Sequence, residues 1–449
     1  MYSPDDTIVA IATPPGRGGL GVVRVSGPEA LVVAQRLTAR STPLVPRHAT
    51  LARTTADAGA ADQVVLTYFK APHSYTGEDV VEISAHGSPV LLRAIVRAAM
   101  GAGSRLAEPG EFTLRAYLRG RIDLVQAEAV RDLVDAVTPL QARAAFDQLE
   151  GTLTERIRAI DTRLFDLAAK LEASLDFPEE GYHFVATDEA VRELTAIVES
   201  ITALLATAAR GRLIREGVLV AIVGRPNAGK SSLFNQLAGA GRAIVAPLPG
   251  TTRDVLTETI DVDGVPMTIV DTAGVRRQPG DEVEAEGIAR AVAAREAASL
   301  TVLVLDRSAP MIDDDLALIE QTAGRPRVVV ANKADLAPAW HVASVGGPVI
   351  EVSARTGRGV EALRRALTGA GDTEATRDTP AVTNLRHVEL LERAREALRR
   401  ARDAAAAGTP EEFVLSDVHD ARSRLEEVTG ARTPDDLLHA IFAKFCIGK

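Results

Sequence analysis

The chain has 449 residues, of which 46% are hydrophobic and 25% are charged, so it has the composition of a globular protein with about three domains. Its formal net charge of -10 at pH 7 excludes general electrostatic attraction to nucleic acid, so any RNA contact needs a local basic patch or a partner. The single cysteine, Cys446, excludes an internal disulfide framework and is typical of a reducing cytoplasm. We expect neither a signal peptide nor an apolar stretch long enough to span a bilayer.

Short strands mixed with helices are predicted in the first 119 residues. Apolar runs predict strands at 7–12, 21–26, 64–69 and 80–84. Helical spacing of apolar residues predicts helices at 28–38 and 88–100. This mixture indicates an α+β domain over residues 1–119.

Beyond residue 119 the apolar residues recur at helical spacing, as in Leu124, Ala127, Val130 and Val134. Within a first helical segment, 120–215, we predict one long helix at 140–175 and another at 188–210. Within a second segment, 378–449, we predict helices at 383–406, 410–429 and 435–444.

Neither helical segment alone offers its amphipathic helices a partner against which to bury their apolar faces. We therefore expect them to fold together as one all-α domain, with residues 216–377 as a domain inserted into it. This arrangement works when the two ends of the inserted domain lie close together.

The segment 216–377 begins with a phosphate-binding pattern. An apolar run at 218–223 predicts a buried strand, and a helical pattern starts after Lys230. Between them, Gly224-x-x-x-x-Gly229-Lys230-Ser231 has the spacing of a loop whose backbone N–H groups converge on phosphates. Lys230 can reach the β- and γ-phosphates, and the Ser231 hydroxyl can bind Mg²⁺. The alternative is a glycine-rich turn that matches by chance, and the strand–loop–helix order disfavours it.

Two polar loops farther along offer more ligands for a nucleotide. Residues 250–254 carry hydroxyls, of which we assign Thr252 to Mg²⁺. A second apolar run ends at 271–274, where Asp271 can hold the Mg²⁺ shell and Gly274 can donate its N–H to the γ-phosphate. Between these loops, Asp263-Gly264 predicts a tight turn that joins two strands.

The pattern Asn332-Lys333-x-Asp335 predicts selectivity for guanine. The Asp335 carboxylate can accept hydrogen bonds from N1–H and the exocyclic amine of guanine, whereas adenine presents a different pattern. Ser353-Ala354-Arg355 ends another predicted strand and would close over the base. Motifs in this order within one domain length predict a Ras-like P-loop GTPase domain over 216–377. We assign nucleotide binding to Asn227, Ala228, Gly229, Lys230, Ser231, Ser232, Ala246, Pro247, Leu248, Thr251, Thr252, Asp271, Thr272, Ala273, Gly274, Asn332, Lys333, Asp335, Ser353, Ala354 and Arg355.

Nearly the whole chain resembles the MnmE (TrmE) family of tRNA uridine-modification GTPases. The N-terminal loop and the Cys-Ile-Gly-Lys tail are more specific than the GTPase motifs, which many families share. The residues that carry the resemblance are 6–10, 12–19, 76–80, 109–112, 224–232, 250–254 and 446–449.

The resemblance implies that the N-terminal domain binds a tetrahydrofolate derivative and forms a homodimer. The family's folate contacts fall on Arg24, Glu82, Arg121 and Lys449. Glu82 would bind the pterin amine and ring N–H, and the cations would face the folate carboxylates. The family commonly has Lys at the position of Arg121, so the charge is kept but its geometry differs. From the residues alone, Arg24 and Glu82 would be an ordinary strand surface pair.

The resemblance also implies potassium-stimulated GTP hydrolysis through the pairing of two GTPase domains. The K⁺ ligands would be Asn227, Thr251 and the backbone carbonyls of Ala246 and Leu248. Val275 lies where Ras-like enzymes carry a water-orienting Gln, and an apolar side chain cannot orient water. Catalysis would use Lys230, Thr251 and Glu284, with Glu284 acting through a bridging water and Glu282 as the alternative to it.

The implied function is GTP-driven addition of a carboxymethylaminomethyl or aminomethyl group at C5 of the wobble uridine in certain tRNAs. A tetrahydrofolate would supply the one-carbon unit. The family's flavoprotein partner, MnmG (GidA), would join in a heterotetramer or larger complex, in the cytoplasm and without a membrane. Two alternatives are a ribosome-assembly-type GTPase switch and a folate-dependent transferase for a small substrate.

Overall fold

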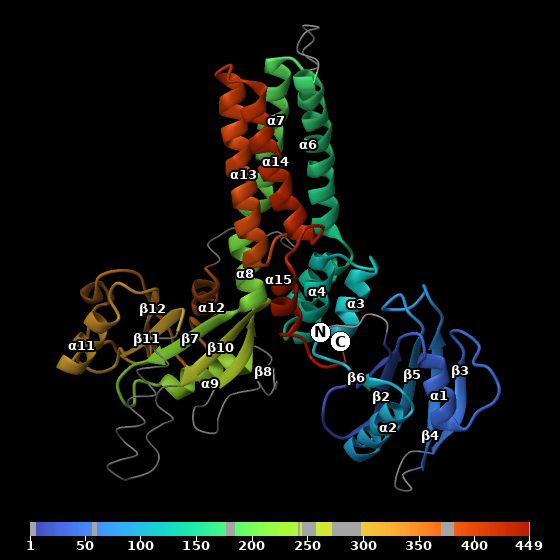
Figure 1. The fold of residues 1–449 in the computed structure, drawn as a ribbon. Coiled ribbons are helices and arrows are strands. Elements are labelled where there is room, and N and C mark those ends of the chain that lie inside the picture. Colours follow the sequence, from blue (N-terminus) through green and yellow to red (C-terminus); the bar gives the residue numbers. More distant parts are fainter. Residues whose placement is uncertain are drawn as a thin grey trace. The chain divides into compact units, whose positions relative to one another are not determined.

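The computed structural model describes residues 6–55, 61–176, 185–240, 243–244, 257–271, 298–369 and 381–448 (Figure 1). The chain divides into two compact units. Unit 1 consists of residues 1–131, 148–197 and 393–449, and unit 2 consists of residues 132–147 and 198–392. Each unit contains its own mixed sheet with helices, which confirms the predicted multidomain α/β class.

The sheet of unit 1 has the strand order β3-β4-β5-β2-β1-β6. Its strands are β1 (Ile8–Ile11), β2 (Gly18–Ser26), β3 (Ala49–Thr55), β4 (Ala61–Phe69), β5 (Val80–Gly87) and β6 (Arg105–Leu106). Neighbours are antiparallel except β1 and β6, which are parallel. Apolar side chains of one face pack against helices α1 (Ala30–Thr38) and α2 (Pro89–Gly101), so the core lies between the sheet and these helices.

The helices of unit 1 come from both ends of the chain. They include α3 (Glu111–Leu118), α6 (Thr152–Asp176), α14 (Glu411–Thr429) and α15 (Asp435–Phe442), while α4 (Leu124–Asp135), α7 (Thr187–Ala206) and α13 (Leu385–Ala406) continue past the unit boundaries. Helix α6 packs along α14 (Figure 1), and Arg422 donates to Asp161 across them at 2.9 Å. Helices on either side of the predicted insertion therefore fold together, as expected.

Two predicted helices are broken in the structure. The predicted helix 140–175 is wrong, because α5 (Pro139–Leu149) and α6 are separate. Gly151 lies between them with a φ of 91°, a left-handed conformation that no helix interior contains. The predicted helix 188–210 is likewise two helices, α7 and α8 (Ala208–Glu216).

One helical stretch, residues 187–216, is long and apolar enough to pass a length-and-composition test for a membrane span. The expectation that no stretch would be long enough is therefore wrong. The core helix of a soluble protein passes the same test. Leu194, Ile197 and Ile201 in this stretch are fully buried in the protein, so the test is weak evidence for a membrane.

The C-terminal tail docks on the N-terminal sheet of unit 1. Ile447 forms an antiparallel bridge with Pro109, and the Gly110 N–H donates to the Cys446 carbonyl at 3.3 Å. Gly448 has a φ of 97°, and a Cβ there would lie 2.2 Å from the Ile11 carbonyl oxygen. Only glycine fits this close approach, which places Gly448 beside the end of β1.

The sheet of unit 2 has the strand order β13-β12-β11-β7-β10-β9-β8. The strands are β7 (Val218–Val223), β8 (Ala243–Ile244), β9 (Thr257–Val262), β10 (Val265–Asp271), β11 (Leu300–Asp306), β12 (Arg327–Asn332) and β13 (Val349–Glu351). The five strands from β13 to β10 are parallel, so their carboxyl ends meet at one edge. The described helices of this unit include α9 (Lys230–Ala240), α11 (Asp313–Gln321), α12 (Val360–Thr368) and a short 3₁₀ helix, Val342–Val345, besides α5 and α8.

The predicted turn at Asp263-Gly264 is confirmed. Antiparallel β9 and β10 pair Val262 with Val265 across it, and φ is positive at both central residues, as in a type I′ hairpin. Within the same unit, Thr138 at the start of α5 donates to the Gly264 carbonyl at 2.8 Å. The hairpin is therefore fixed by its turn and by α5.

A buried ion network in unit 1 joins three distant segments. Arg115 on α3 is only 1% exposed, and it donates to Asp6 at 2.6 Å, to Glu111 at 2.8 Å and to Glu78 at 3.2 Å. Arg105 also donates to Glu111, at 2.6 Å. These contacts tie Asp6, two residues before β1, to the loop 74–79, to α3 and to Arg105 of β6.

Replacing Arg115 with Met should destabilise α3. The substitution leaves the Glu78 and Glu111 carboxylates buried without their main cation, and breaking a buried pair in this way costs about 3–5 kcal/mol. Hydrogen exchange of the α3 amides measures the local opening free energy. Arg97→Met on the exposed side of α2 is the matched control, and equal exchange in both variants would contradict the prediction.

The network should also weaken in acid. Burial raises the pKa of Glu111, but hydrogen bonds from Arg105, from the Glu108 N–H and from Arg115 outweigh it, so this pKa lies below its ordinary value of 4.5. The ionised carboxylate therefore stabilises the fold above pH 4.5, and this stabilisation is lost as pH falls through the lower folded-state pKa. We expect α3 protection to decline below pH 4.5 in the wild type and to change less in Glu111→Gln. Parallel pH profiles in the two proteins would refute this assignment.

Candidate active site

The phosphate-loop residues lie between β7 and α9, at the carboxyl edge of the sheet. Lys230 begins α9 and is buried, and its Nζ donates to the carbonyls of Gly224 and Arg225 at 2.8 Å each. Gly229 has a φ of 94°, and a Cβ there would lie 2.2 Å from Asn332 Nδ2. The strand–loop–helix order predicted from the sequence is confirmed, and the Lys230 ammonium lies over the loop backbone.

Asn332 joins the phosphate loop to the two predicted base-binding loops. This side chain is 1% exposed, its Nδ2 donates to the Ala228 carbonyl at 2.9 Å, and its Oδ1 accepts from the Ala354 N–H at 3.1 Å. An amide suits this position because it offers one donor and one acceptor. The structure therefore brings together three of the motifs that the sequence predicts for a nucleotide.

Asp335 lies beside Asn332 and is held as a carboxylate. It accepts from Ser353 Oγ at 2.6 Å, and Arg355 Nε lies 3.2 Å from its other oxygen. The hydrogen bond from Ser353 lowers the pKa of Asp335, and the charge of Arg355 adds to this effect. An ionised Asp335 is the form that accepts hydrogen bonds from guanine.

Asp306, at the end of β11, contacts the predicted base-binding loop and was missed by the motif analysis. Its carboxylate lies 2.6 Å from Lys333 Nζ and also accepts from Ser308 N–H and Oγ. Burial raises the pKa of Asp306, but the bonds from Lys333 and Ser308 outweigh it and lower that pKa. Its position at the carboxyl end of a parallel strand was the available sequence signal.

Several predicted nucleotide residues lie outside the described part of the chain. They are Ala246, Pro247, Leu248, Thr251, Thr252, Thr272, Ala273, Gly274, Glu284 and its alternative Glu282. Asp271 ends β10 opposite Ile222 of β7, so its backbone reaches the same edge as the phosphate loop. Asn227, with a φ of 65°, and exposed Ser231 and Ser232 lie in and just after the loop. The roles of all these residues stay predictions.

The folate contacts implied by the resemblance lie in unit 1. Arg24 and Glu82 face each other across β2 and β5, and Arg24 donates twice to Glu82 Oε1, at 2.8 and 3.0 Å. This is the strand pair expected from the residues alone, and the Arg24 guanidinium also lies 5.4 Å from the centre of the Tyr75 ring. The Arg121 stem lies near Gly77, in the same loop as Tyr75. Lys449 lies outside the described residues.

Removing the charge of Asp306 should weaken binding of guanine nucleotides. Asp306→Asn loses the charge-assisted bond that holds Lys333, which is worth about 1.5–3 kcal/mol, so we expect roughly tenfold or greater loss of GDP affinity. Titration with a fluorescent guanine nucleotide measures the change. Asp313→Asn, on the exposed start of α11, is the control, and unchanged affinity in Asp306→Asn would reject the positioning role.

Comparisons with known proteins cover the chain almost end to end. The family model described as "GTP-binding protein TrmE N-terminus" matches residues 7–121, and that described as "MnmE helical domain" matches residues 124–446. The chain is 44% identical over 452 residues to the tRNA modification GTPase MnmE of Koribacter versatilis, covering 99% of both chains. It is 43% identical to that of Chloroflexus aurantiacus, covering 99% of this chain and 100% of the relative. The crystal structure of the G domain of the T. maritima FeoB iron transporter matches 34% of this chain and 97% of its own, with 28% identity and a TM-score of 0.27. This chain belongs to the MnmE (TrmE) family of tRNA modification GTPases.

Proposed function

We propose that this chain hydrolyses GTP to drive, with a flavoprotein partner, addition of a carboxymethylaminomethyl or aminomethyl group at C5 of the wobble uridine of certain tRNAs. The bridge made by Asn332 carries the GTPase part, because it positions the phosphate loop and the base-binding loops around one place. The ionised Asp335 at that place supports guanine as the base. The relatives' description as tRNA modification GTPases supports the RNA substrate.

The proposed catalytic residues surround the phosphates of GTP. Lys230 binds the β- and γ-phosphates, and its present carbonyl partners show that the ammonium is directed toward the loop. Glu284, or Glu282 in its place, orients the attacking water, with Thr251 in the neighbouring loop. The remaining nucleotide contacts are those assigned from the sequence.

Two metal ions are part of the proposal. The hydroxyls of Ser231 and Thr252 and the carboxylate of Asp271 are the oxygen ligands that Mg²⁺ prefers, and a bound Mg²⁺ would neutralise phosphate charge. Asn227 would hold K⁺ together with Thr251 and the carbonyls of Ala246 and Leu248. Asn227 has a positive φ, so the backbone turns at this residue in the middle of the phosphate loop. Such a turn is compatible with a K⁺ ligand at this position.

The chemistry of unit 1 suits a folate. Both bonds from Arg24 use Glu82 Oε1, so Oε2 remains available for a pterin amine as far as the described residues go. The Tyr75 ring beside Arg24 offers a flat apolar surface for a flat ligand. Arg121 and Lys449 would bind folate carboxylates, and the folate would supply the one-carbon unit.

The proposal divides the chain as the sequence suggests. Residues 1–119 would bind folate and form the homodimer, and residues 216–377 would form the GTPase domain. Residues 120–215 and 378–449 would form the helical domain and carry the tail. The MnmG (GidA) flavoprotein would complete a cytoplasmic heterotetramer or larger complex and would supply much of the RNA-binding charge.

The test is mass spectrometry of tRNA nucleosides from cells that lack the chain. We expect loss of the C5-modified wobble uridine, restored by the wild type but not by Lys230→Ala, because the variant cannot bind the β- and γ-phosphates. Lys444→Ala, an exposed lysine outside the proposed site, should restore the modification. An unchanged nucleoside profile in the deletion strain would reject the tRNA role in favour of a ribosome-assembly switch.

A further inference from the structure

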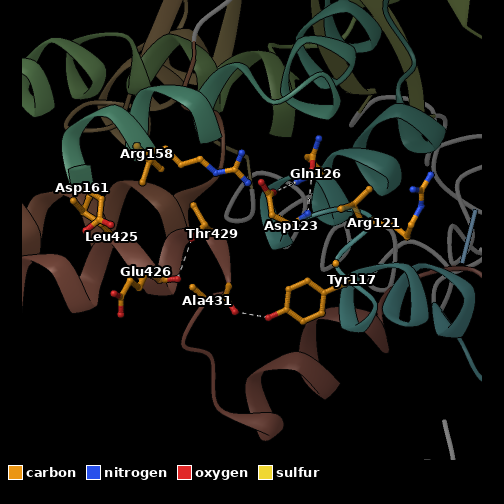
Figure 2. Close-up of a pocket in the computed structure, with 14 residues that line it drawn as sticks. Tyr117, Arg121, Asp123, Gln126, Arg158, Asp161, Leu425, Glu426, Thr429 and Ala431 are labelled. Atoms are coloured by element: carbon orange, nitrogen blue, oxygen red, sulfur yellow. Dashed lines mark hydrogen bonds between the residues drawn. The ribbon is translucent and has the colours of Figure 1, made fainter. Parts of the chain in front are cut away.

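A cavity of about 610 Å³ lies within unit 1, apart from the predicted nucleotide site. Figure 2 shows its lining, which comes from the segment joining α3 to α4, from α6 and from the C-terminal end of α14. Tyr117 closes one side by donating its hydroxyl to the Gly430 carbonyl at 2.5 Å. The cavity is therefore formed by three segments that are far apart in the sequence.

The carboxylates that line this cavity already have partners. Asp161 accepts from Arg422 at 2.9 Å, and Arg432 Nε lies 2.8 Å from Glu426 Oε2 in an ion pair. Asp123 accepts from the Thr154 hydroxyl at 2.6 Å. Asp161 and Glu426 are therefore neutralised by arginines outside the lining, whereas Asp123 keeps its charge and accepts hydrogen bonds from Thr154 and from the Gln126 N–H. Within the described residues, only one of the three carboxylates adds uncompensated negative charge to the cavity.

Unlike two of these carboxylates, the two arginines that line the cavity have no ion-pair partners in the described part of the chain. These arginines, Arg121 and Arg158, are both exposed. In the view of Figure 2, Asp123 and Gln126 lie between them. The lining thus includes two separated arginines and two uncharged polar side chains, Gln126 and Thr429. The Gln126 amide already donates to the Leu149 carbonyl at 2.8 Å and accepts from the Asp123 N–H, so only its second N–H and second lone pair are open to a ligand.

Arg121 connects this cavity to the proposed folate contacts. Its stem lies near Gly77, and the same loop carries Tyr75, whose ring lies beside Arg24. Arg121 therefore belongs both to the proposed folate contacts and to the lining of the cavity. Arg158 is the other cation in that lining.

We propose that this cavity binds the poly-γ-glutamate tail of the folate, with tail carboxylates paired to Arg121 and Arg158. This inference rests on the proposed folate site. Each γ-linked glutamate adds one carboxylate, which suits a guanidinium, and one amide group, which suits Gln126 and Thr429. The cavity volume accommodates more than one such residue.

The same lining argues against an RNA backbone as the ligand. RNA-binding surfaces are strongly positive, and their cations act on phosphates that carry no hydrogen-bond donors. Here the two arginines share the cavity with the Asp123 carboxylate, which no cation neutralises within the described residues, and with two carboxylates that are already paired. A γ-glutamyl chain tolerates these carboxylates because its amide N–H groups can donate to them.

The experiment compares 5-formyltetrahydrofolate carrying one glutamate with the form carrying five, by calorimetry on the full chain. We expect about fivefold to tenfold tighter binding of the pentaglutamate by the wild type. Arg158→Ala should lose this gain and keep the affinity for the monoglutamate, and Arg158→Lys should keep part of the gain. Arg156→Ala removes an exposed charge from the same helix outside the cavity and should behave as the wild type.

Each other outcome has a distinct meaning. Equal affinity of the wild type for both folates, or a gain that survives in Arg158→Ala, overturns the tail site while leaving the folate site intact. Failure to bind either folate overturns the folate site itself and this inference with it. A retained glutamate gain with weakened tRNA binding in Arg158→Ala would assign the arginine to RNA.

Discussion

The Arg115 guanidinium is the contact on which the arrangement of unit 1 depends. It is almost fully buried and pairs with carboxylates before β1, in the loop 74–79 and on its own helix. That loop places Tyr75 beside Arg24 and Gly77 beside Arg121, so the proposed folate contacts take their positions from a cluster that would not touch the ligand. A buried charge with several partners is costly to misplace, which makes it an effective anchor for such a loop.

In unit 2, a neutral side chain, that of Asn332, holds the loops of the predicted site in place. The carbonyl of Ala228 and the N–H of Ala354 require one donor and one acceptor between them, and the amide of Asn332 supplies both. A carboxylate at this position would lack the donor, and its charge would oppose the phosphates of a nucleotide. The charged partners, Lys333 with Asp306 and Asp335 with Arg355, lie around this neutral centre.

Residue type and spacing within short segments predicted those parts of the fold that neighbouring residues determine. The strand at 218–223, the loop after it and the turn at Asp263-Gly264 follow from residue type and spacing, and the structure confirms them. Strand β3 was missed because its sequence has no apolar run and it pairs only with β4 at the sheet edge. The Asp306–Lys333 pair and the cavity around Arg158 were missed because their partners meet only after folding. The role of Glu284, which lies outside the described residues, rests on the resemblance to the MnmE family alone.

The pairing of charges also affects how strongly the chain could bind RNA. Many of its arginines are already used by carboxylates, as Arg422 is by Asp161 and Arg400 is by Asp417, and the net charge is -10. Counterion release from a nucleic acid needs cations that are free to bind phosphates, so these pairs and the negative net charge reduce that driving force. The two arginines that line the cavity without an ion pair among the described residues, Arg121 and Arg158, instead suit a small anionic ligand. In the proposed function, the recognition of tRNA would therefore fall mainly to the flavoprotein partner, and this chain would contribute the nucleotide cycle and the folate site.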